Sequence, residues 1–189
     1  MTAFFNTIGW SPQIGDPSFG GWFTVFAYAL CCYRSYQVFR NSERIFIAPI
    51  PRQCWLWGTI AVSMLLLGIN KQLDLQTFFT ATARYLAWQQ GWYEHRRALQ
   101  KVFILVIACG GLAAMLAMLV TYRKVWRWHI YAILGTSTLL VFVMVRASSF
   151  HNVDLFLGSR FMGLRMNWLL ELSGIALVLY NARLLMRKR

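Results

Sequence analysis

The chain has 189 residues, of which 58% are hydrophobic and only 13% are charged. Charged residues make up about a quarter of an ordinary soluble domain, so this composition excludes that class and indicates an integral protein of the lipid bilayer. The formal net charge is +13. The lysines and arginines stand in short clusters between apolar runs, as topology signals facing anionic lipid do, and we expect no nucleic-acid partner.

Five segments are long and apolar enough to be predicted as crossings, since a helix needs about 20 mostly apolar residues to cross a bilayer. Asp16 and Pro17 predict the start of the first, with a capping carboxylate and a proline in the first turn. The residues before them lack the charged stretch of a secretory signal, so we expect this helix to be retained. Asn167 is expected to cap the last crossing. The predicted crossings are residues 20–36, 54–69, 102–122, 128–145 and 168–186.

The connection between the second and third crossings is too long to be a plain turn. Its apolar residues near helical spacing include Leu75, Phe78, Phe79 and Leu86. This pattern predicts an amphipathic helix on the outer membrane interface over residues 73–90, ended by Gly91. Residues 155–166 are expected to lie on the interface in a similar way. The predicted fold class is therefore all-α, a polytopic membrane helix bundle of about five transmembrane helices plus an interfacial helix, in one domain over residues 1–189.

Lysines and arginines divide unequally between the two sides of these crossings. Eleven lie on the side that holds the C-terminus, and eight lie on the other side, where the longest loop carries five of them. Cytoplasmic loops carry the excess of basic residues under the positive-inside rule, and long loops obey that rule less strictly. We therefore expect the N-terminus outside and the C-terminus in the cytoplasm.

Small residues recur four apart in the third crossing, where Gly110 pairs with Ala114 and Ala113 pairs with Ala117. Such pairs allow another helix backbone to approach closely. Packing inside this bundle and binding of a partner membrane protein both account for this face.

The topology gathers polar residues from three segments at the outer leaflet. Glu171 is expected about one turn inside the membrane, where an ionised carboxylate is costly and normally faces a partner or a water-filled cavity. Its candidate partners are Arg146, Lys71 and His151. The predicted polar site comprises Asn70, Lys71, Asp74, Arg146, Ser148, His151, Asn152, Asp154 and Glu171.

Several chemistries fit this cluster. His151 and Asp154 are three apart, and with Asp74 or Glu171 they could form a mixed nitrogen and oxygen site for zinc or iron. Alternatively, Asp154 could orient His151 as a general base, or these residues could only hydrogen-bond a surface loop. Glu171 in turn could brace helices in an ion pair, relay protons or contact a ligand.

The segments GINKQLDLQTFFT, GWYEHRRALQ, RASSFHNVD and NWLLELSGIALV resemble a family of small bacterial inner-membrane proteins that carry NKQLDLQ and SFHxxD segments. This resemblance spans roughly residues 53–182 and implies a bacterial inner (plasma) membrane location but no activity. The grouping of a serine with His151 and Asp154 is more distantly similar to the CREST superfamily of membrane hydrolases, which implies zinc-dependent hydrolysis. That superfamily has seven crossings and paired histidines in its last helix, where this chain offers only Glu171.

The function predicted first is a non-catalytic integral membrane subunit or binding module, whose outer-leaflet polar site holds a lipid headgroup, a small ligand or a partner protein. The alternative is a metal-dependent membrane hydrolase or transferase centred on His151, Asp154, Asp74 and Glu171. A transporter or channel is disfavoured, because five short helices enclose little volume and polar residues look scarce in the inner half of the bundle.

Overall fold

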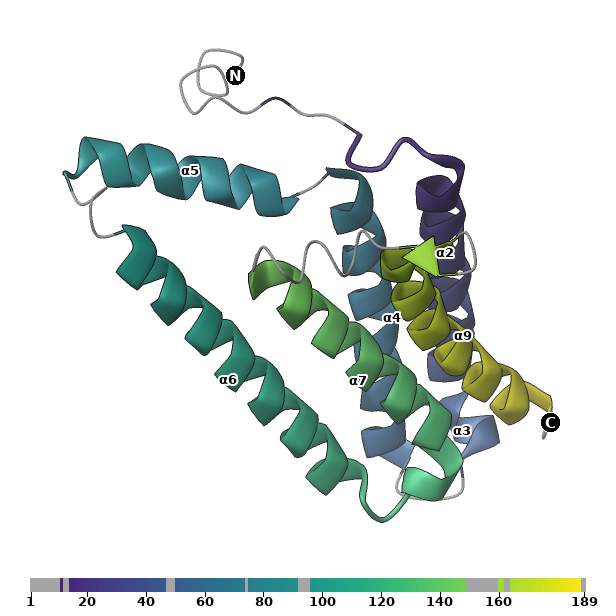
Figure 1. Cartoon of the computed structure of the whole chain (residues 1–189). Coiled ribbons are helices and arrows are strands. Elements are labelled where there is room, and N and C mark those ends of the chain that lie inside the picture. The colour runs from purple at the N-terminus through teal and green to yellow at the C-terminus, as the bar shows by residue number, and fades with distance from the viewer. Residues whose placement is uncertain are drawn as a thin grey trace.

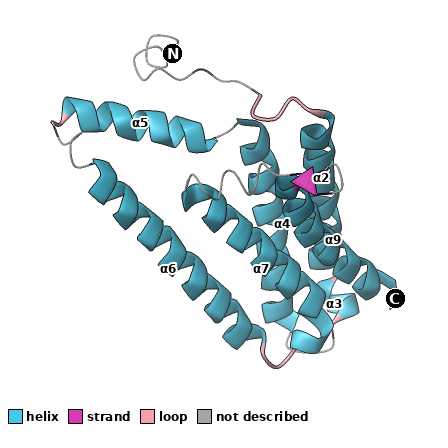
Figure 2. Ribbon diagram, in the orientation of Figure 1, coloured by secondary structure: helices cyan, strands magenta, loops and turns pink. Residues whose placement is uncertain are grey.

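The computed structural model describes residues 11, 14–46, 50–73, 75–91, 96–148, 160–161 and 164–187. Apart from loops and one pair of two-residue strands, these parts of the chain are helical (Figures 1 and 2), which confirms the predicted helical class. The elements in chain order are α2 (Phe19–Arg40), α3 (Ser42–Ile45), α4 (Ile50–Leu73), α5 (Leu75–Gln89), α6 (Arg96–Tyr122), α7 (Trp126–Ser148), β1 (Arg160–Phe161), β2 (Leu164–Arg165) and α9 (Met166–Arg187).

Four helices in the described part of the chain are long and apolar enough to cross a membrane. These candidate spans are Pro51–Leu73, Leu105–Tyr122, Trp126–Arg146 and Met166–Arg187. The predicted first crossing falls on α2, which is not among them. Arg34 and Gln37 in the last turns of α2 lower its hydropathy, so five crossings stay a prediction.

The helices alternate in direction along the chain (Figure 1). The N-terminal ends of α2 and α9 lie at the same end of the bundle as the C-terminal ends of α4 and α7. α5 lies across this end, which we call the α5 end, while α3 and the C-terminus lie toward the other. α2, α4, α7 and α9 pack together, and α6 packs against α7.

The described surface is apolar in the way that lipid requires. Large side chains such as Phe19 and Phe26 of α2 are exposed, whereas Thr24 and Ser35 of the same helix are fully buried. No residue of the α6 span is buried. The exposed face of such a helix is more apolar than the face that packs against other helices. This arrangement is suited to hydrocarbon surroundings, because lipid does not force apolar side chains into a core.

The predicted caps of α2 and α9 are wrong. Ser18, not Asp16, caps α2, and the Ser18 hydroxyl accepts a hydrogen bond from Gly21 N at 3.1 Å. Asp16 instead accepts hydrogen bonds from the backbone N–H and the hydroxyl of Ser18. α9 begins at Met166, so Asn167 lies in its first turn and not at its cap. Ser18 is the N-cap because it precedes Gly21 by three residues. At this spacing an N-cap side chain accepts a hydrogen bond from a backbone N–H that has no partner within the helix.

The helix predicted over residues 73–90 is present as α5, and Gly91 follows it with φ of 75°, the left-handed conformation that glycine adopts readily. The described part of residues 155–166 differs from the expected interfacial helix. There, β1 pairs antiparallel with β2, with Arg160 opposite Arg165.

The contact between α7 and α9 depends on two facing glycines. A Cβ atom added to Gly135 would lie 2.5 Å from the carbonyl oxygen of Gly174, and one added to Gly174 would lie 2.7 Å from Leu139 Cγ. One residue without a side chain on each helix therefore lets the two backbones touch. This contact fixes the distance at which α9 stands from α7 and so helps to position the residues that α9 carries at the α5 end.

The small-residue face of α6 does not pack inside the described bundle. Gly110, Ala113, Ala114 and Ala117 are all exposed, and Gly110 has nothing within 4 Å of a Cβ position. Gly111, on another face of α6, instead meets Met144 of α7. Binding of a partner helix to the exposed face stays a prediction.

Candidate functional site

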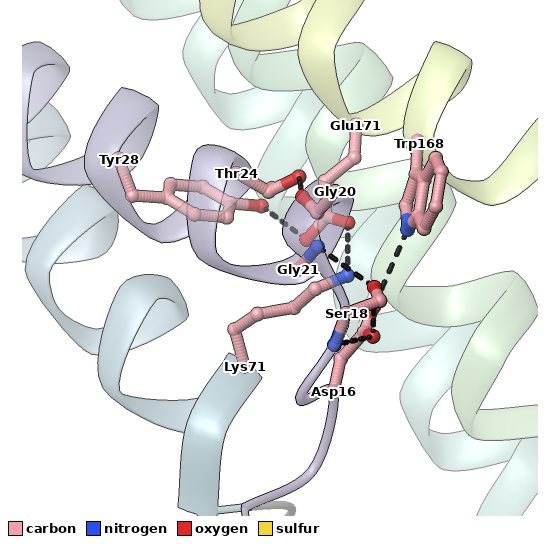
Figure 3. Close-up of polar contacts among 9 residues, drawn as sticks. All are labelled: Asp16, Ser18, Gly20, Gly21, Thr24, Tyr28, Lys71, Trp168 and Glu171. Atoms are coloured by element: carbon pink, nitrogen blue, oxygen red, sulfur yellow. Dashed lines mark hydrogen bonds and ion pairs between the residues drawn. The ribbon is translucent and has the colours of Figure 1, made fainter. Parts of the chain in front are cut away.

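A buried ion pair joins α4 to α9 at the α5 end. Lys71 Nζ lies 2.6 Å from Glu171 Oε2, and the two side chains are only 3% and 4% exposed. The Tyr28 hydroxyl of α2 donates a hydrogen bond to the other carboxylate oxygen at 3.0 Å. Figure 3 shows the three side chains converging from three helices. Each oxygen of Glu171 therefore has a donor, which a charge shielded from water requires.

The segment before α2 is held against the same cluster. Trp168 Nε1 of α9 donates to Asp16 Oδ2 at 3.3 Å, while Ser18 donates to Asp16 Oδ1 (Figure 3). Gly21 permits this approach, because an added Cβ would lie 2.3 Å from the carbonyl oxygen of Asp16. Partial burial alone would raise the pKa of Asp16, but the hydrogen bonds from Ser18 and Trp168 and the charge of Lys71 together lower that pKa below its usual value of 3.8.

Asp16→Asn is expected to lower the free energy of unfolding by about 1 kcal/mol near pH 7, because one carboxylate oxygen becomes an amide nitrogen that accepts no hydrogen bond. Folding lowers the pKa of Asp16, so the charged carboxylate contributes fully to the free energy of unfolding above about pH 4. This contribution is lost as the pH falls through the lower pKa that Asp16 has in the folded protein. Thermal unfolding in detergent at neutral and acid pH measures the difference. A deficit that does not shrink as the pH is lowered progressively below 3.8, the usual pKa of the group, would contradict this role.

An open polar cleft of about 390 Å³ lies beside the ion pair. Its lining residues come from the segment before α2 and from the ends of α4, α7 and α9: Gly15, Asp16, Pro17, Ser18, Lys71, Arg146 and Asn167. The Asn167 Oδ1 atom is buried and has no hydrogen-bond partner in the described part of the chain. Two cationic side chains, one carboxylate and one carboxamide therefore face a common space.

The structure brings together part of the predicted polar site. Lys71 and Glu171 are in contact, so Lys71, one of the three candidates, is a partner of Glu171, and Arg146 lines the adjoining cleft. Asn70 precedes Lys71 in the last turn of α4. Ser148 ends α7, and its side chain lies outside the described residues. Asp74, His151, Asn152 and Asp154 also lie outside the described residues.

The described residues hold no group of three or more His, Cys, Asp or Glu side chains that could bind a metal ion. Three of the four candidate ligands for zinc or iron, namely Asp74, His151 and Asp154, lie outside those residues. The fourth, Glu171, is engaged by Lys71 and Tyr28. The predicted metal site therefore stays a prediction.

Sequence reasoning missed Tyr28 and Trp168 as members of this site. A usable signal was present in α2, where Thr24, Tyr28, Cys31 and Ser35 recur at helical spacing and are all buried. In a helix whose remaining surface is aromatic and aliphatic, a stripe of small and polar residues indicates the face turned toward other helices. The hydroxyl of Tyr28 was therefore the natural donor to seek for a buried carboxylate.

A second buried polar cluster lies at the other end of the bundle. His129 Nδ1 accepts a hydrogen bond from Trp57 Nε1 at 3.3 Å, so His129 Nε2 carries the proton and donates it to Gln53 Oε1 at 2.8 Å. Asn181 of α9 accepts from Ala132 N and donates to Trp128 O, both in α7. The expectation that polar residues are scarce in the inner half of the bundle is therefore wrong.

The two polar clusters are separated by a mostly apolar layer. Met64, Leu139, Ile175 and Val178 are fully buried between them along α4, α7 and α9. A transport path needs polar groups or water along its length, and the described residues of this layer offer chiefly hydrocarbon. The second cluster therefore ties α4, α7 and α9 together on the far side of this layer.

His129→Phe is expected to lower the free energy of unfolding by about 1–3 kcal/mol, because the buried Trp57 N–H loses its acceptor. Thermal unfolding in detergent measures this loss. Adding Trp57→Phe to His129→Phe is expected to cost less than the sum of the two single changes, since the double variant leaves no stranded N–H. Strict additivity would show that the contact carries no energy.

Comparison of the chain with known protein families, with curated proteins and with solved structures finds no match.

Proposed function

We propose that this chain is a bacterial inner-membrane protein with five crossings, its N-terminus outside and its C-terminus in the cytoplasm. The four apolar helices supply four crossings, and α2 supplies the first. With 22 residues, α2 is about 33 Å long, which matches a hydrocarbon core of about 30 Å. α2 runs antiparallel to α4 and α7 and parallel to α9, which supports this assignment (Figure 1).

We infer that the protein acts as a non-catalytic binding module whose polar site lies in the outer leaflet and holds a lipid headgroup, a small ligand or a partner protein. The observation that carries the proposal is the buried Lys71–Glu171 ion pair beside the open polar cleft. The ion pair is satisfied by its own members and by Tyr28, so it is a rigid support for the cleft.

The cleft favours binding over chemistry. The one side-chain hydroxyl among its described lining residues belongs to Ser18, and that oxygen already accepts a hydrogen bond from Gly21 N. The described lining offers no histidine or cysteine to act as base or nucleophile. Asn167 instead presents an unpartnered acceptor, its Oδ1 atom, and Arg146 lines the same space with its guanidinium group, so the lining is suited to holding a polar group in place.

Purification in mild detergent tests this proposal. A lipid, small molecule or protein is expected to accompany the wild-type chain at a constant molar ratio, measured by mass spectrometry of the denatured sample. Arg146→Gln should remove it, because Arg146 lines the cleft, whereas Arg123→Gln at the opposite end should not. The proposal fails if nothing accompanies the protein at a constant ratio, or if both variants retain the same component equally.

A further inference from the structure

Four exposed cationic side chains gather at the end of the bundle opposite the α5 end. One comes from the first turn of α4, and the others come from the turn between α6 and α7 and from the start of α7. We call them the basic cluster: Arg52, Arg123, Lys124 and Arg127. α4 and α7 are in contact beside this cluster, since His129 hydrogen-bonds both Trp57 and Gln53, the neighbour of Arg52. The positive charge of Arg52 also acts on the Tyr122 hydroxyl, next to Arg123.

The basic cluster is not neutralised by the acidic residues that the structure describes. Glu43 of α3 is the one acidic residue at this end among the described parts of the chain (Figure 1). Within those parts it forms no ion pair with the cluster. Four positive charges against one negative charge leave a net charge of +3. Like charges held close together at a membrane surface repel one another, so the cluster favours an anionic occupant.

A mostly apolar stripe of α4 begins at the basic cluster. Arg52 and Trp55 are three residues apart, so they share a face of the helix, and Trp55 is 73% exposed. The same face continues toward the α5 end at helical spacing. Its further residues are all exposed: Thr59, Val62, Leu66, Ile69 and Leu73. An occupant of the cluster therefore lies beside a strip of α4 that faces hydrocarbon.

Exposed tryptophans surround the cluster at the same level. Trp55, Trp126 and Trp128 are each half exposed or more, and tryptophan prefers the headgroup zone of a membrane. An acidic protein segment or a nucleic acid would approach from water and contact the cations alone. A membrane lipid covers the cations with its headgroup and the tryptophans and the α4 stripe with its chains, so the surface fits an anionic amphiphile best.

We propose that the basic cluster binds one phospholipid with two phosphate groups, of the diphosphatidylglycerol type. Basic pockets between membrane helices on the cytoplasmic side suit such headgroups, and guanidinium groups match the oxygen geometry of phosphate. Two phosphates can contact α4 and the turn between α6 and α7 at the same time, whereas one phosphate leaves most of the net charge without a counter-charge. The inference rests on the proposed crossings, and it does not depend on what occupies the polar cleft at the α5 end.

Native mass spectrometry of the purified full-length chain tests the proposal with diphosphatidylglycerol, phosphatidylglycerol and phosphatidylcholine as probes. Wild type should retain one diphosphatidylglycerol about fivefold more tightly than phosphatidylglycerol, and phosphatidylcholine least. Arg52→Gln and Arg127→Gln should each weaken the retention of diphosphatidylglycerol by about fivefold, the effect of one cation near a membrane surface. Neither side chain has a hydrogen bond to another described residue, so both variants should fold as wild type does.

The matched controls are Arg187→Gln, at an exposed arginine of α9 toward the same end, and Arg146→Gln in the polar cleft. Both should retain diphosphatidylglycerol as wild type does. Equal retention of the three lipids by wild type overturns the proposal. Equal weakening by Arg187→Gln also overturns it, because the basic residues would then attract anionic lipid without forming a site. Displacement by a heptaglutamate peptide at similar concentration would assign the cluster to an acidic protein segment instead.

The two binding proposals can fail separately. The polar cleft is judged by the component that Arg146→Gln removes during mild purification, and the basic cluster is judged by the lipid that Arg52→Gln and Arg127→Gln release.

Discussion

Lys71→Met is expected to lower the free energy of unfolding by about 3–5 kcal/mol, because it leaves the buried carboxylate of Glu171 without its counter-charge. Both side chains are almost inaccessible, so water cannot replace the missing ammonium without opening the contact between α4 and α9. Thermal or denaturant unfolding of the protein in detergent micelles measures the loss. Of the substitutions considered, this one should have the largest effect.

Two variants separate the loss of the ion pair from the loss of a lysine. Lys71→Met combined with Glu171→Leu should recover much of the stability, because apolar replacement of both partners leaves no stranded charge. Lys124→Met, at an exposed lysine between α6 and α7, should change stability by less than about 0.5 kcal/mol. A double variant no more stable than Lys71→Met alone would contradict the account of the pair.

Gly135→Leu is expected to have the second largest effect, a loss of about 1–3 kcal/mol or more, because the α7 and α9 backbones must separate to admit a side chain. The added Cβ would lie 2.5 Å from the Gly174 carbonyl oxygen and 2.9 Å from Val178 Cγ2. Unfolding in detergent measures the effect. The shift of α9 should also move Glu171 away from Lys71.

Gly110→Leu provides the matched control for this prediction. Gly110 is also a helical glycine in an apolar helix, but nothing lies within 4 Å of its Cβ position. The substitution should leave stability within about 0.5 kcal/mol of wild type or raise it slightly, since leucine favours a helix more than glycine does. Equal losses at both positions would show that the contact between α7 and α9 is not tight.

The helices were predictable because each apolar run is long and is bounded by polar residues, but their ends were not. The second crossing was predicted over residues 54–69, whereas α4 extends over Ile50–Leu73. Gln53 and Lys71 lie beyond the predicted ends and are nevertheless buried, because each is paired by a residue more than 70 positions away. Polar residues mark the end of a crossing only when no other helix offers them a partner.

Only part of the candidate site was predictable, and for a related reason. Glu171 was recognised because a carboxylate in hydrocarbon needs a partner, and counting crossings then placed Lys71 and Arg146 at the same membrane surface. Tyr28 was missed because it stands among other aromatic residues of α2, and only the stripe that it forms with Thr24 and Ser35 sets it apart as inward-facing. His129 was missed because its two partners, Gln53 and Trp57, both lie on α4, and their contact depends on how α4 and α7 pack.

Labelling of single cysteines in intact cells tests most directly whether the α5 end of a five-crossing bundle faces outward. In a background with the four native cysteines replaced, cysteines would be placed at exposed positions 14, 43, 90 and 124. A membrane-impermeant maleimide is expected to label Ile14→Cys and Gln90→Cys in intact cells, and Glu43→Cys and Lys124→Cys only after permeabilisation. Labelling of positions 14 and 43 from the same side would contradict the assignment of α2 as a crossing. Labelling of position 124 but not of position 90 in intact cells would contradict the location of the site in the outer leaflet.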